Sequence, residues 1–326
     1  MAAPTVIKWT DSGAPSLTRT AGSLIGVLDY CLPQRGWVKE FSGTGKAVYR
    51  AGSGERKYYR VLNDGSFYYG NNIAYQYCHA KITAYDSMTD VDTGAGQWAE
   101  TYFPLSTSGT AVVRPWLCVF DEKTVLLVTI PNKTTGLTLE TSNSLLQGFG
   151  ETKPALTGQT ARNFLAGHLS NGLIASPDSN YCPLACPGTY ALNVSYGRMH
   201  CNRSLDGSRT AIPVGLTSNG GAVDVSDLRN PFGRSSSLAL SYPYNGELLY
   251  GRPMLDDGIA LSMGDYIPYL YYPCQKGNTF NNWGVYASGL VQFIAVRVTY
   301  LYGITLATTD ASYIGAVLLN VSEDLA

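Results

Sequence analysis

Three cysteines and one histidine lie close together in residues 181–201, YCPLACPGTYALNVSYGRMHC. Cys182, Cys186, His200 and Cys201 are residue types that bind zinc, which takes four such ligands in a tetrahedron. The alternation of the residues before His200 predicts a strand, and neighbouring strand residues point to opposite faces, so His200 and Cys201 do not easily reach one ion. We expect buried, reduced cysteines beside a turn. A zinc site and a Cys182–Cys186 disulfide formed after release into an oxidising environment stay open as alternatives.

Three aspartates in DSMTDVDTG, namely Asp86, Asp90 and Asp92, are of the kind that binds calcium. An EF-hand loop beginning at Asp90 requires glycine at its sixth position and glutamate at its twelfth. Those positions hold Ala95 and Thr101. We therefore expect the aspartates to cap a turn, with a calcium site of another type as the open alternative.

The segment GTGKA, residues 43–47, contains the Gly-Lys pair of a phosphate-binding loop. That motif also needs a glycine five residues before Gly45 and Ser or Thr after the lysine. The chain has Glu40 and Ala47 there, so the segment predicts a hairpin turn.

The sequence has few residues in patterns typical of a catalytic site. A Ser-His-Asp triad would need His79, His168 or His200, and none of these accompanies a Gly-x-Ser-x-Gly elbow. Paired carboxylates for glycoside hydrolysis stay open, because their spacing is spatial. The two candidate pairs are Asp256 with Asp257 and Glu100 with Glu151. We predict a protein that is not an enzyme, and we assign no catalytic, cofactor-binding or metal-binding residues.

The composition indicates a surface made for protein contacts. Of 326 residues only 14% are charged, against roughly 25% in an average soluble protein, and the net charge is −1. Such a chain has no global attraction to nucleic acid or acidic membranes. Its apolar runs at Thr124–Ile130 and Ile314–Val321 are too short to span a bilayer. The first residues lack the basic and apolar regions of a secretory signal, so we expect synthesis in a cytoplasm, where the seven cysteines form no disulfide framework.

Tyrosine is unusually frequent, with 24 copies against 9 phenylalanines. The tyrosine-rich segments suit either a sugar-binding surface or a subunit interface, and the low charge favours the interface. They are KYYRV, SFYYG, IAYQYC, SYPYNGELLYG and YIPYLYYP, and the tyrosines of the last two lie within 240–272.

The apolar pattern predicts a mainly β protein with one short helix. Leu24, Ile25, Val27, Leu28 and Cys31 recur at helical spacing within Gly22–Leu32, and Pro33 ends the pattern. Short strands between turn residues are predicted from Gly36 onward. They include Trp37–Phe41, Lys46–Arg50, Lys57–Leu62, Lys81–Tyr85 and a hairpin whose tip is 121–123.

This pattern predicts an extended N-terminal arm and two β-rich domains, each a sandwich or barrel. The arm covers residues 1–20, and we expect it to be mobile or docked onto a neighbour. The domains are 21–140, which includes the helix, and 141–326, with the turn-rich segment 132–159 as the boundary region. Trp37, Phe41, Tyr49, Arg50 and Trp116 are expected in the core of the first domain.

Several segments resemble a family of tailed-bacteriophage and prophage virion proteins. The segments that carry the resemblance are APTVIKWTDSGAPSLTRTAGSLIGVLDYCL (3–32), GWVKEFSGTGKAVYRAGSG (36–54), YDSMTDVDTG (85–94) and VRPW (113–116). A looser likeness covers MGDYIPYLYYPCQKGNTF (263–280), where Cys274 replaces the family's histidine. The resemblance extends over most of the chain and is weaker after Phe120.

The resemblance implies a structural subunit of a virion, assembled in the host cytoplasm at the tail, the collar or neck, or the baseplate. Its expected partners are copies of itself, in a ring or trimer, and other virion proteins, with an arm that extends a neighbour's sheet. A receptor- or glycan-binding tail component and a capsid decoration protein are the alternatives. The family implies no catalytic residues.

Overall fold

The structure is a computed structural model. It describes residues 3–65, 67–69, 76–107, 113–130, 144–154, 158–167, 184, 198–204, 207, 210–217, 250–252, 254–256, 265–273, 280–298 and 315–322. Its described strands form three antiparallel sheets, which confirms the mainly β prediction. Within these ranges, no helix has the length and apolar character needed to cross a membrane.

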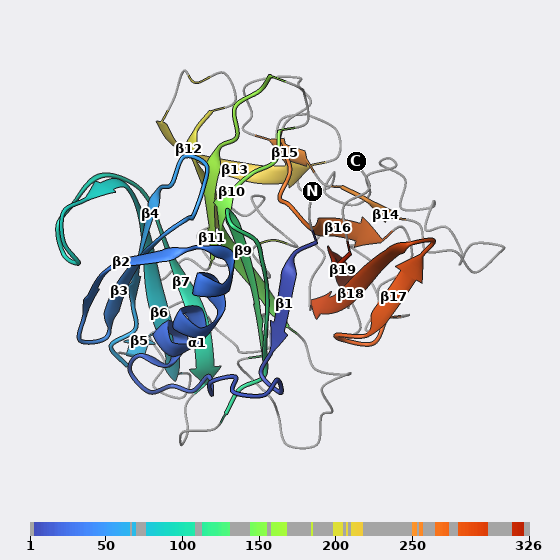
Figure 1. The fold of residues 1–326 in the computed structure, drawn as a ribbon, viewed down its shortest axis with the longest axis horizontal. Helices are drawn as coiled ribbons and strands as arrows, with labels where there is room; N and C mark the ends of the chain where they lie inside the picture. Colours follow the sequence, from blue (N-terminus) through green and yellow to red (C-terminus); the bar gives the residue numbers. More distant parts are fainter. Residues whose placement is uncertain are drawn as a thin grey trace.

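The sheets are arranged in three layers (Figure 1). An eight-stranded sheet lies in the middle, with a six-stranded sheet and the helix on one side and a five-stranded sheet on the other. Both faces of the middle sheet are therefore covered by other parts of the chain. This explains why strands β8 (Trp116–Phe120), β9 (Thr124–Thr129) and β11 (Asn163–Gly167) are buried along their whole length.

The single α-helix, α1, spans Ser23–Cys31 and continues as a 3-10 turn over Leu32–Arg35. The five apolar residues whose spacing predicted it are all buried. Pro33 lies at the start of the 3-10 turn, where its missing N–H costs no hydrogen bond. Leu24 donates its backbone N–H to Asn63 Oδ1 at 2.9 Å, which ties the first turn of the helix to the six-stranded sheet.

The six-stranded sheet comes from the first third of the chain. Its strands are β2 (Val38–Gly43), β3 (Lys46–Arg50), β4 (Tyr58–Leu62), β5 (Phe67–Tyr69), β6 (Gln76–Met88) and β7 (Gly94–Thr107). The GTGKA segment forms the β2–β3 turn, as predicted. Of the five expected core residues, Trp37, Tyr49 and Trp116 are buried, whereas Phe41 and Arg50 are half-buried.

The eight-stranded middle sheet draws on most of the chain. In spatial order its strands are β1 (Thr5–Lys8), β8 (Trp116–Phe120), β9 (Thr124–Thr129), β10 (Leu145–Glu151), β11 (Asn163–Gly167), β12 (Arg198–Arg203), β13 (Thr210–Thr217) and β15 (Met254–Asp256). The hairpin with its tip at 121–123 is β8–β9.

The five-stranded sheet is built from the last third of the chain. In spatial order its strands are β14 (Tyr250–Gly251), β16 (Leu270–Pro273), β19 (Gly315–Asn320), β18 (Val291–Val298) and β17 (Val285–Ser288).

Two apolar cores separate the layers. On one face of the middle sheet, Trp116, Cys118 and Phe120 of β8 pack with α1 and the six-stranded sheet. On the other face, Leu117 and Val119 pack with the five-stranded sheet. The alternation along β8 therefore serves two cores, and every residue of the strand is buried.

The N-terminal arm is extended, but it docks on its own chain. Strand β1 pairs with β8 in antiparallel register, with Ile7 opposite Cys118. Arg35 donates to the Ala3 carbonyl at 2.9 Å, and Trp9 donates its N–H to the Trp116 carbonyl at 3.0 Å. Within this chain the arm completes the edge of the middle sheet, and its contact with a neighbour stays a prediction.

The segment predicted as the boundary contains a core strand. Residues Leu145–Glu151 form β10, which is buried along its length and pairs with β9 and β11. The middle sheet thus takes strands from both sides of residue 140. The division into 21–140 and 141–326 remains a prediction about folding units.

Candidate functional site

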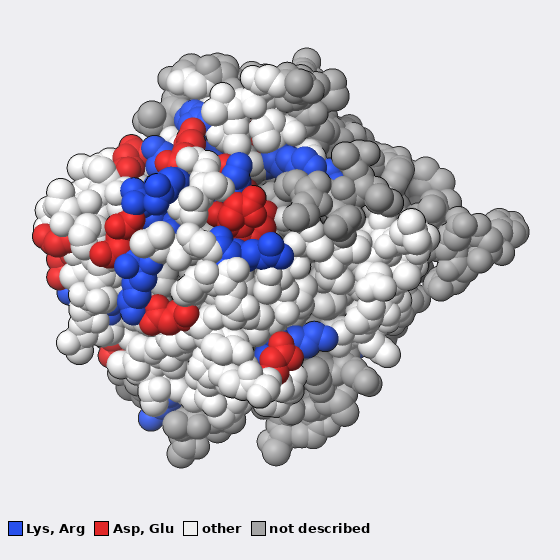
Figure 2. Space-filling model, viewed as in Figure 1, with Lys and Arg blue, Asp and Glu red and all other residues white. Residues whose placement is uncertain are grey.

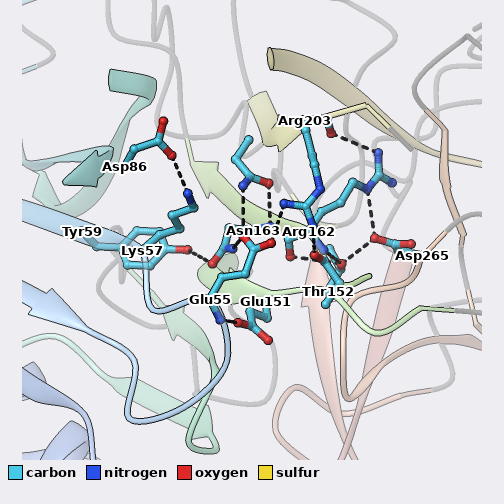
Figure 3. Close-up of polar contacts among 12 residues, drawn as sticks. Glu55, Lys57, Tyr59, Asp86, Glu151, Thr152, Arg162, Asn163, Arg203 and Asp265 are labelled. Carbon is cyan, nitrogen blue, oxygen red and sulfur yellow. Dashed lines mark hydrogen bonds and ion pairs between the residues drawn. The ribbon is translucent and has the colours of Figure 1, made fainter. Parts of the chain in front are cut away.

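Polar side chains from all three layers meet at one place, which we call the polar junction (Figure 3). The junction consists of Glu55, Asp121, Glu151, Thr152, Arg162, Asn163, Asn202, Arg203 and Asp265. Glu55 belongs to the β3–β4 loop of the six-stranded sheet, and Asp265 precedes β16 of the five-stranded sheet. The others lie at the ends of β8 to β12 in the middle sheet.

Glu55 is the link between the six-stranded sheet and the middle sheet. Its Oε2 accepts hydrogen bonds from Asn163 Nδ2 at 2.7 Å and Asn202 Nδ2 at 3.3 Å. Arg203 forms an ion pair with its Oε1 at 2.5 Å. Asn163 in turn donates its N–H to Asn202 Oδ1 at 2.9 Å, so β11 and β12 present one surface to the loop.

Glu151, at the end of β10, binds the same loop from the other side. Its Oε1 accepts the backbone N–H of Glu55, and Lys123 Nζ lies 3.7 Å from its Oε2. Burial raises the pKa of this carboxyl, while the Glu55 N–H and the Lys123 charge oppose the rise. The carboxylate is enclosed by protein, with 5% of its side chain exposed.

Arg162 and Asp265 form a buried ion pair between the middle sheet and the five-stranded sheet. Arg162 Nε lies 2.9 Å from Asp265 Oδ2, and the two side chains are 1% and 0% exposed. Thr152 donates its hydroxyl to the same oxygen at 2.6 Å and accepts the Arg162 N–H at 2.9 Å. A buried pair of this kind depends on both partners, since either charge alone would be costly to bury.

Asp121, in the β8–β9 turn, contacts all three layers. Its Oδ1 accepts the backbone N–H groups of Lys123 and Thr124, both at 2.7 Å. Tyr269, from the core beside the five-stranded sheet, donates its hydroxyl to Oδ2 at 2.6 Å. Trp37, from the core beside the six-stranded sheet, donates its indole N–H to the Asp121 carbonyl at 2.7 Å. Burial raises the pKa of Asp121, and the hydrogen bonds from Tyr269, Lys123 and Thr124 to its carboxylate oppose the rise.

We expect Asp121→Asn to change how stability depends on pH. Because the folded-state pKa of Asp121 is raised, the folded protein keeps a proton that the unfolded chain has lost, from about pH 4 upward. The Asp121 contribution to the free energy of unfolding is therefore largest at acidic pH and is lost as the pH rises through the folded-state pKa. Urea unfolding of wild type and variant across this range measures the difference. Parallel pH curves would contradict the assignment.

The polar junction fastens the three layers by charge and hydrogen bonding. Each of its four carboxylates binds donors. Glu55 binds Arg203 and two side-chain amides, and Asp121 binds backbone N–H groups and the Tyr269 hydroxyl. Glu151 binds the Glu55 N–H and Lys123, and Asp265 binds Arg162 and Thr152. Asp121, Glu151 and Asp265 are buried, whereas the Glu55 side chain is 26% exposed. The arrangement therefore favours a structural role for the junction.

The proposed zinc ligands are only partly described. Cys182 and Cys186 lie outside the described residues. On β12, Cys201 is opposite Phe164 and packs in the core beside the five-stranded sheet, whereas His200 is opposite Leu165 of the other core. The two side chains point to opposite faces, as their spacing predicted. In the ranges that the structure covers, no three His, Cys, Asp or Glu side chains are grouped to hold a metal ion.

The three aspartates of the proposed calcium loop bind separate partners. Asp90 Oδ1 accepts the backbone N–H groups of Asp92 and Thr93, both at 2.7 Å, which is the turn-capping role expected. Asp92 pairs with Lys46 at 2.7 Å, and Asp86 pairs with Lys57 at 2.6 Å.

The remaining candidate residues are distributed over different parts of the fold. His79 is buried on β6, and His168 lies outside the described residues. Glu100 pairs with Lys81 on the six-stranded sheet at 3.3 Å, whereas Glu151 pairs with Lys123 at 3.7 Å. The two carboxylates therefore have different ion-pair partners. Asp256 ends β15, and Asp257 is not among the described residues.

Of the tyrosines in 240–272 whose side chains the structure describes, Tyr269 and Tyr271 are buried, and Tyr250 and Tyr266 are half-buried. The rings of Tyr250 and Tyr271 meet edge to face at 5.4 Å, and Arg252 lies over the Tyr266 and Tyr271 rings. Tyr269 is buried against Asp121.

Sequence reasoning singled out only Glu151 among the residues of the polar junction. One further signal was present in the sequence, namely polar residues directly beside a buried strand, and it stands out because the chain has few charged residues. Arg162 and Asn163 directly precede the buried run FLAG, and a charge beside a buried strand requires a partner. The identity of that partner, Asp265, has no local signal.

No protein-family model matches this chain, and a search of curated proteins finds no match either.

Proposed function

We propose that the protein is a structural subunit of a tailed-bacteriophage virion, built into the tail, the collar or neck, or the baseplate through contacts with its own copies and with other virion proteins. The observation that carries the proposal is the distribution of charge over the fold. The resemblance of several segments to virion proteins supplies the class of particle.

Most charged side chains on the visible surface are gathered on one part of it. Figure 2 shows Lys, Arg, Asp and Glu of both signs gathered over the six-stranded sheet and the polar junction, while much of the remaining described surface in this view carries few. Several of these charges neutralise one another, as in Lys46–Asp92, Lys57–Asp86 and Arg203–Glu55. Depletion of charge is typical of the centre of protein interfaces, so this surface supports burial by partners.

The segments that resemble virion proteins contact one another in the fold. The arm contacts the VRPW segment at two places. Leu17 forms an isolated β-bridge with Arg114, and the Trp116 indole N–H donates to the Pro15 carbonyl at 3.0 Å. The FSGTGK turn meets the DVDTG turn through Lys46 and Asp92. Segments that pack against one another in this way stabilise the fold, which is what a structural protein requires.

The outer edge of the five-stranded sheet also supports a contact with another chain. In the part of the chain that the structure describes, β17 is the last strand of its sheet. Val285 on this strand and Leu290 in the following turn are 60% and 85% exposed. Free edge strands are usually guarded by charges or proline, and this one presents apolar side chains instead.

We expect the double variant Val285→Lys, Leu290→Lys to weaken self-association of the purified chain at least about tenfold, because two charges would be buried in the contact. Light scattering over a concentration series measures the association. The matched control is Val38→Lys on β2, which is 40% exposed and adds the same kind of charge elsewhere. A monomeric wild type, or equal association of all three proteins, would remove β17 as the self-contact.

The proposal is tested on the particle itself. Phage particles are purified, the chain is identified by mass spectrometry, and a cryo-EM reconstruction locates its copies. A ring or trimer at the tail, neck or baseplate is the expected result. Copies spread over the head lattice would indicate a capsid decoration protein, and distal copies with affinity for host glycans would indicate a receptor-binding component. Absence from purified particles would refute the virion role.

A further inference from the structure

Strand β17 directs backbone hydrogen-bonding groups away from its own sheet (Figure 1). It pairs with β18 across the two-residue turn 289–290. Next to the strand, the Ala295 N–H donates to the Gly284 carbonyl at 2.9 Å, so the alternation of the pair directs the even-numbered residues of β17 toward β18. The N–H and C=O groups of Val285 and Ala287 therefore point outward, and both residues are exposed.

The sequence of β17 lacks the features that usually keep sheet edges apart. In the described part of the chain, four strands of four or more residues pair on one side only, namely β1, β2, β7 and β17. Lys8 lies on β1, Glu40 on β2 and Pro104 on β7. Charged residues and proline of this kind oppose pairing with another chain. Residues 277–296, which include β17, contain no charged residue and no proline.

The lack of charge indicates which strand fits this edge. A partner strand with charged side chains would bury them against an edge that offers no opposite charge, which is costly. Among the four strands that pair on one side only, β17 is the one with neither a charge nor proline. A second copy of the chain therefore presents a matching strand, and two identical strands in antiparallel pairing are related by a two-fold axis.

We propose that β17 of one copy pairs with β17 of a second copy, antiparallel, so that the two five-stranded sheets become one continuous sheet. Tyr286 lies at the two-fold axis, and Val285 of each copy lies opposite Ala287 of the other. These opposite residues exchange N–H and C=O groups across the axis. Val285, which is 60% exposed in the single chain, then packs beside the second strand.

The register follows from the backbone groups that are available. A two-fold axis at Val285 would place Ala287 opposite Trp283, whose N–H already donates to the Ala295 carbonyl at 2.6 Å. An axis at Ala287 would place Val285 opposite Gly289, which lies in the turn. Only the axis at Tyr286 pairs both outward residues within the regular strand.

This pairing deepens the self-contact in the proposed function, and it is tested on the purified full-length chain. Val285→Cys and Ala287→Cys each add one cysteine. Residues opposite each other in paired strands have Cα atoms about 5.5 Å apart, within reach of a disulfide. Two copies of the same variant would hold their added cysteines more than about 8 Å apart, because the residues are offset along the strands. A mixture of the two variants should therefore cross-link, and each variant alone should not.

A tryptic peptide identifies the product. Residues 277–297 form one peptide, which contains no native cysteine. The mixed and unmixed variants are oxidised with copper phenanthroline, capped with N-ethylmaleimide and digested without reductant. We expect a disulfide between the 277–297 peptides of the two variants, at least about tenfold more abundant than in either variant alone. No such disulfide in the mixture, or equal amounts in all samples, would overturn the pairing.

A second measurement uses no added cysteine. Ala287→Pro removes an outward N–H and leaves the bonds between β17 and β18 in place, so sedimentation should show self-association at least about tenfold weaker. The matched control, Ala287→Ser, keeps the N–H and should associate like wild type. Equal association of both variants, or a monomeric wild type, would overturn the pairing. The cross-link decides if the proline variant folds poorly. Failure of both tests removes this contact alone, because the virion role is decided on the particle.

Discussion

Gly54→Ala is expected to lower the free energy of unfolding by about 3–4 kcal/mol, because it strains the backbone and displaces a buried carboxylate. Gly54 has φ +76°, a conformation that costs an L-residue about 1–2 kcal/mol. A Cβ atom there would collide with the Glu151 carboxylate. Glu151 would have to withdraw from the Glu55 N–H, which would separate the β3–β4 loop from the middle sheet. Urea unfolding followed by tryptophan fluorescence measures the change.

Gly289→Ala is the matched control for the backbone strain. Gly289 also has positive φ, at +58°, but a Cβ there meets nothing within 4 Å. Only the conformational cost of about 1–2 kcal/mol should remain. Glu151→Ala in the Gly54→Ala background removes the collision, so the double variant should lose less than the sum of the single losses. If Gly54→Ala and Gly289→Ala lowered the free energy of unfolding equally, the Glu151 carboxylate would have moved aside at no cost in stability.

Asp265→Ala is expected to destabilise the protein by about 3–5 kcal/mol. The substitution leaves the Arg162 charge buried without its carboxylate, and it removes the acceptor of the Thr152 hydroxyl. Because Asp265 precedes β16, the loss should loosen the five-stranded layer first. Hydrogen exchange should then show faster exchange at β16 and β18 than at β3 and β4.

A surface ion pair provides the comparison for Asp265. Asp86 pairs with Lys57 at 2.6 Å, but its side chain is 54% exposed. Solvent screening limits such pairs to about 0–1 kcal/mol, so Asp86→Ala should be nearly neutral. Replacing both members of the buried pair, as Arg162→Met with Asp265→Ala, should recover part of the loss, since no charge is then left buried. A double variant no more stable than Asp265→Ala would contradict the ion-pair explanation.

Local patterns predicted the elements whose faces differ in polarity. The five apolar positions of α1 are all buried, and the predicted strand Lys46–Arg50 coincides with β3. Strand β10 was missed because it is buried on both faces and contains two glycines, so LLQGFGE has no alternation to detect. The three-layer arrangement, and with it the pairing of β1 with β8, depends on contacts between distant segments.

The polar junction could not be assembled from the sequence for a related reason. Glu55, Asn163 and Arg203 come from three separate parts of the chain, and each is unremarkable in its own segment. The spacing argument at His200 and Cys201 succeeded because adjacent strand residues must diverge. Local geometry can thus show that two neighbouring side chains diverge, while the assembly of a site requires the folded layers.

Coverage of the middle sheet on both faces has a consequence for how the chain folds during synthesis. The face that carries Leu117 and Val119 is covered by strands β16 to β19, which leave the ribosome after the whole middle sheet. Until then a wide apolar surface is open to water, and partly folded chains of this kind aggregate or bind chaperones. The pairing of distant strands also slows the final step. We therefore expect folding to be completed after translation, with nascent chains that end before β16 retained by chaperones.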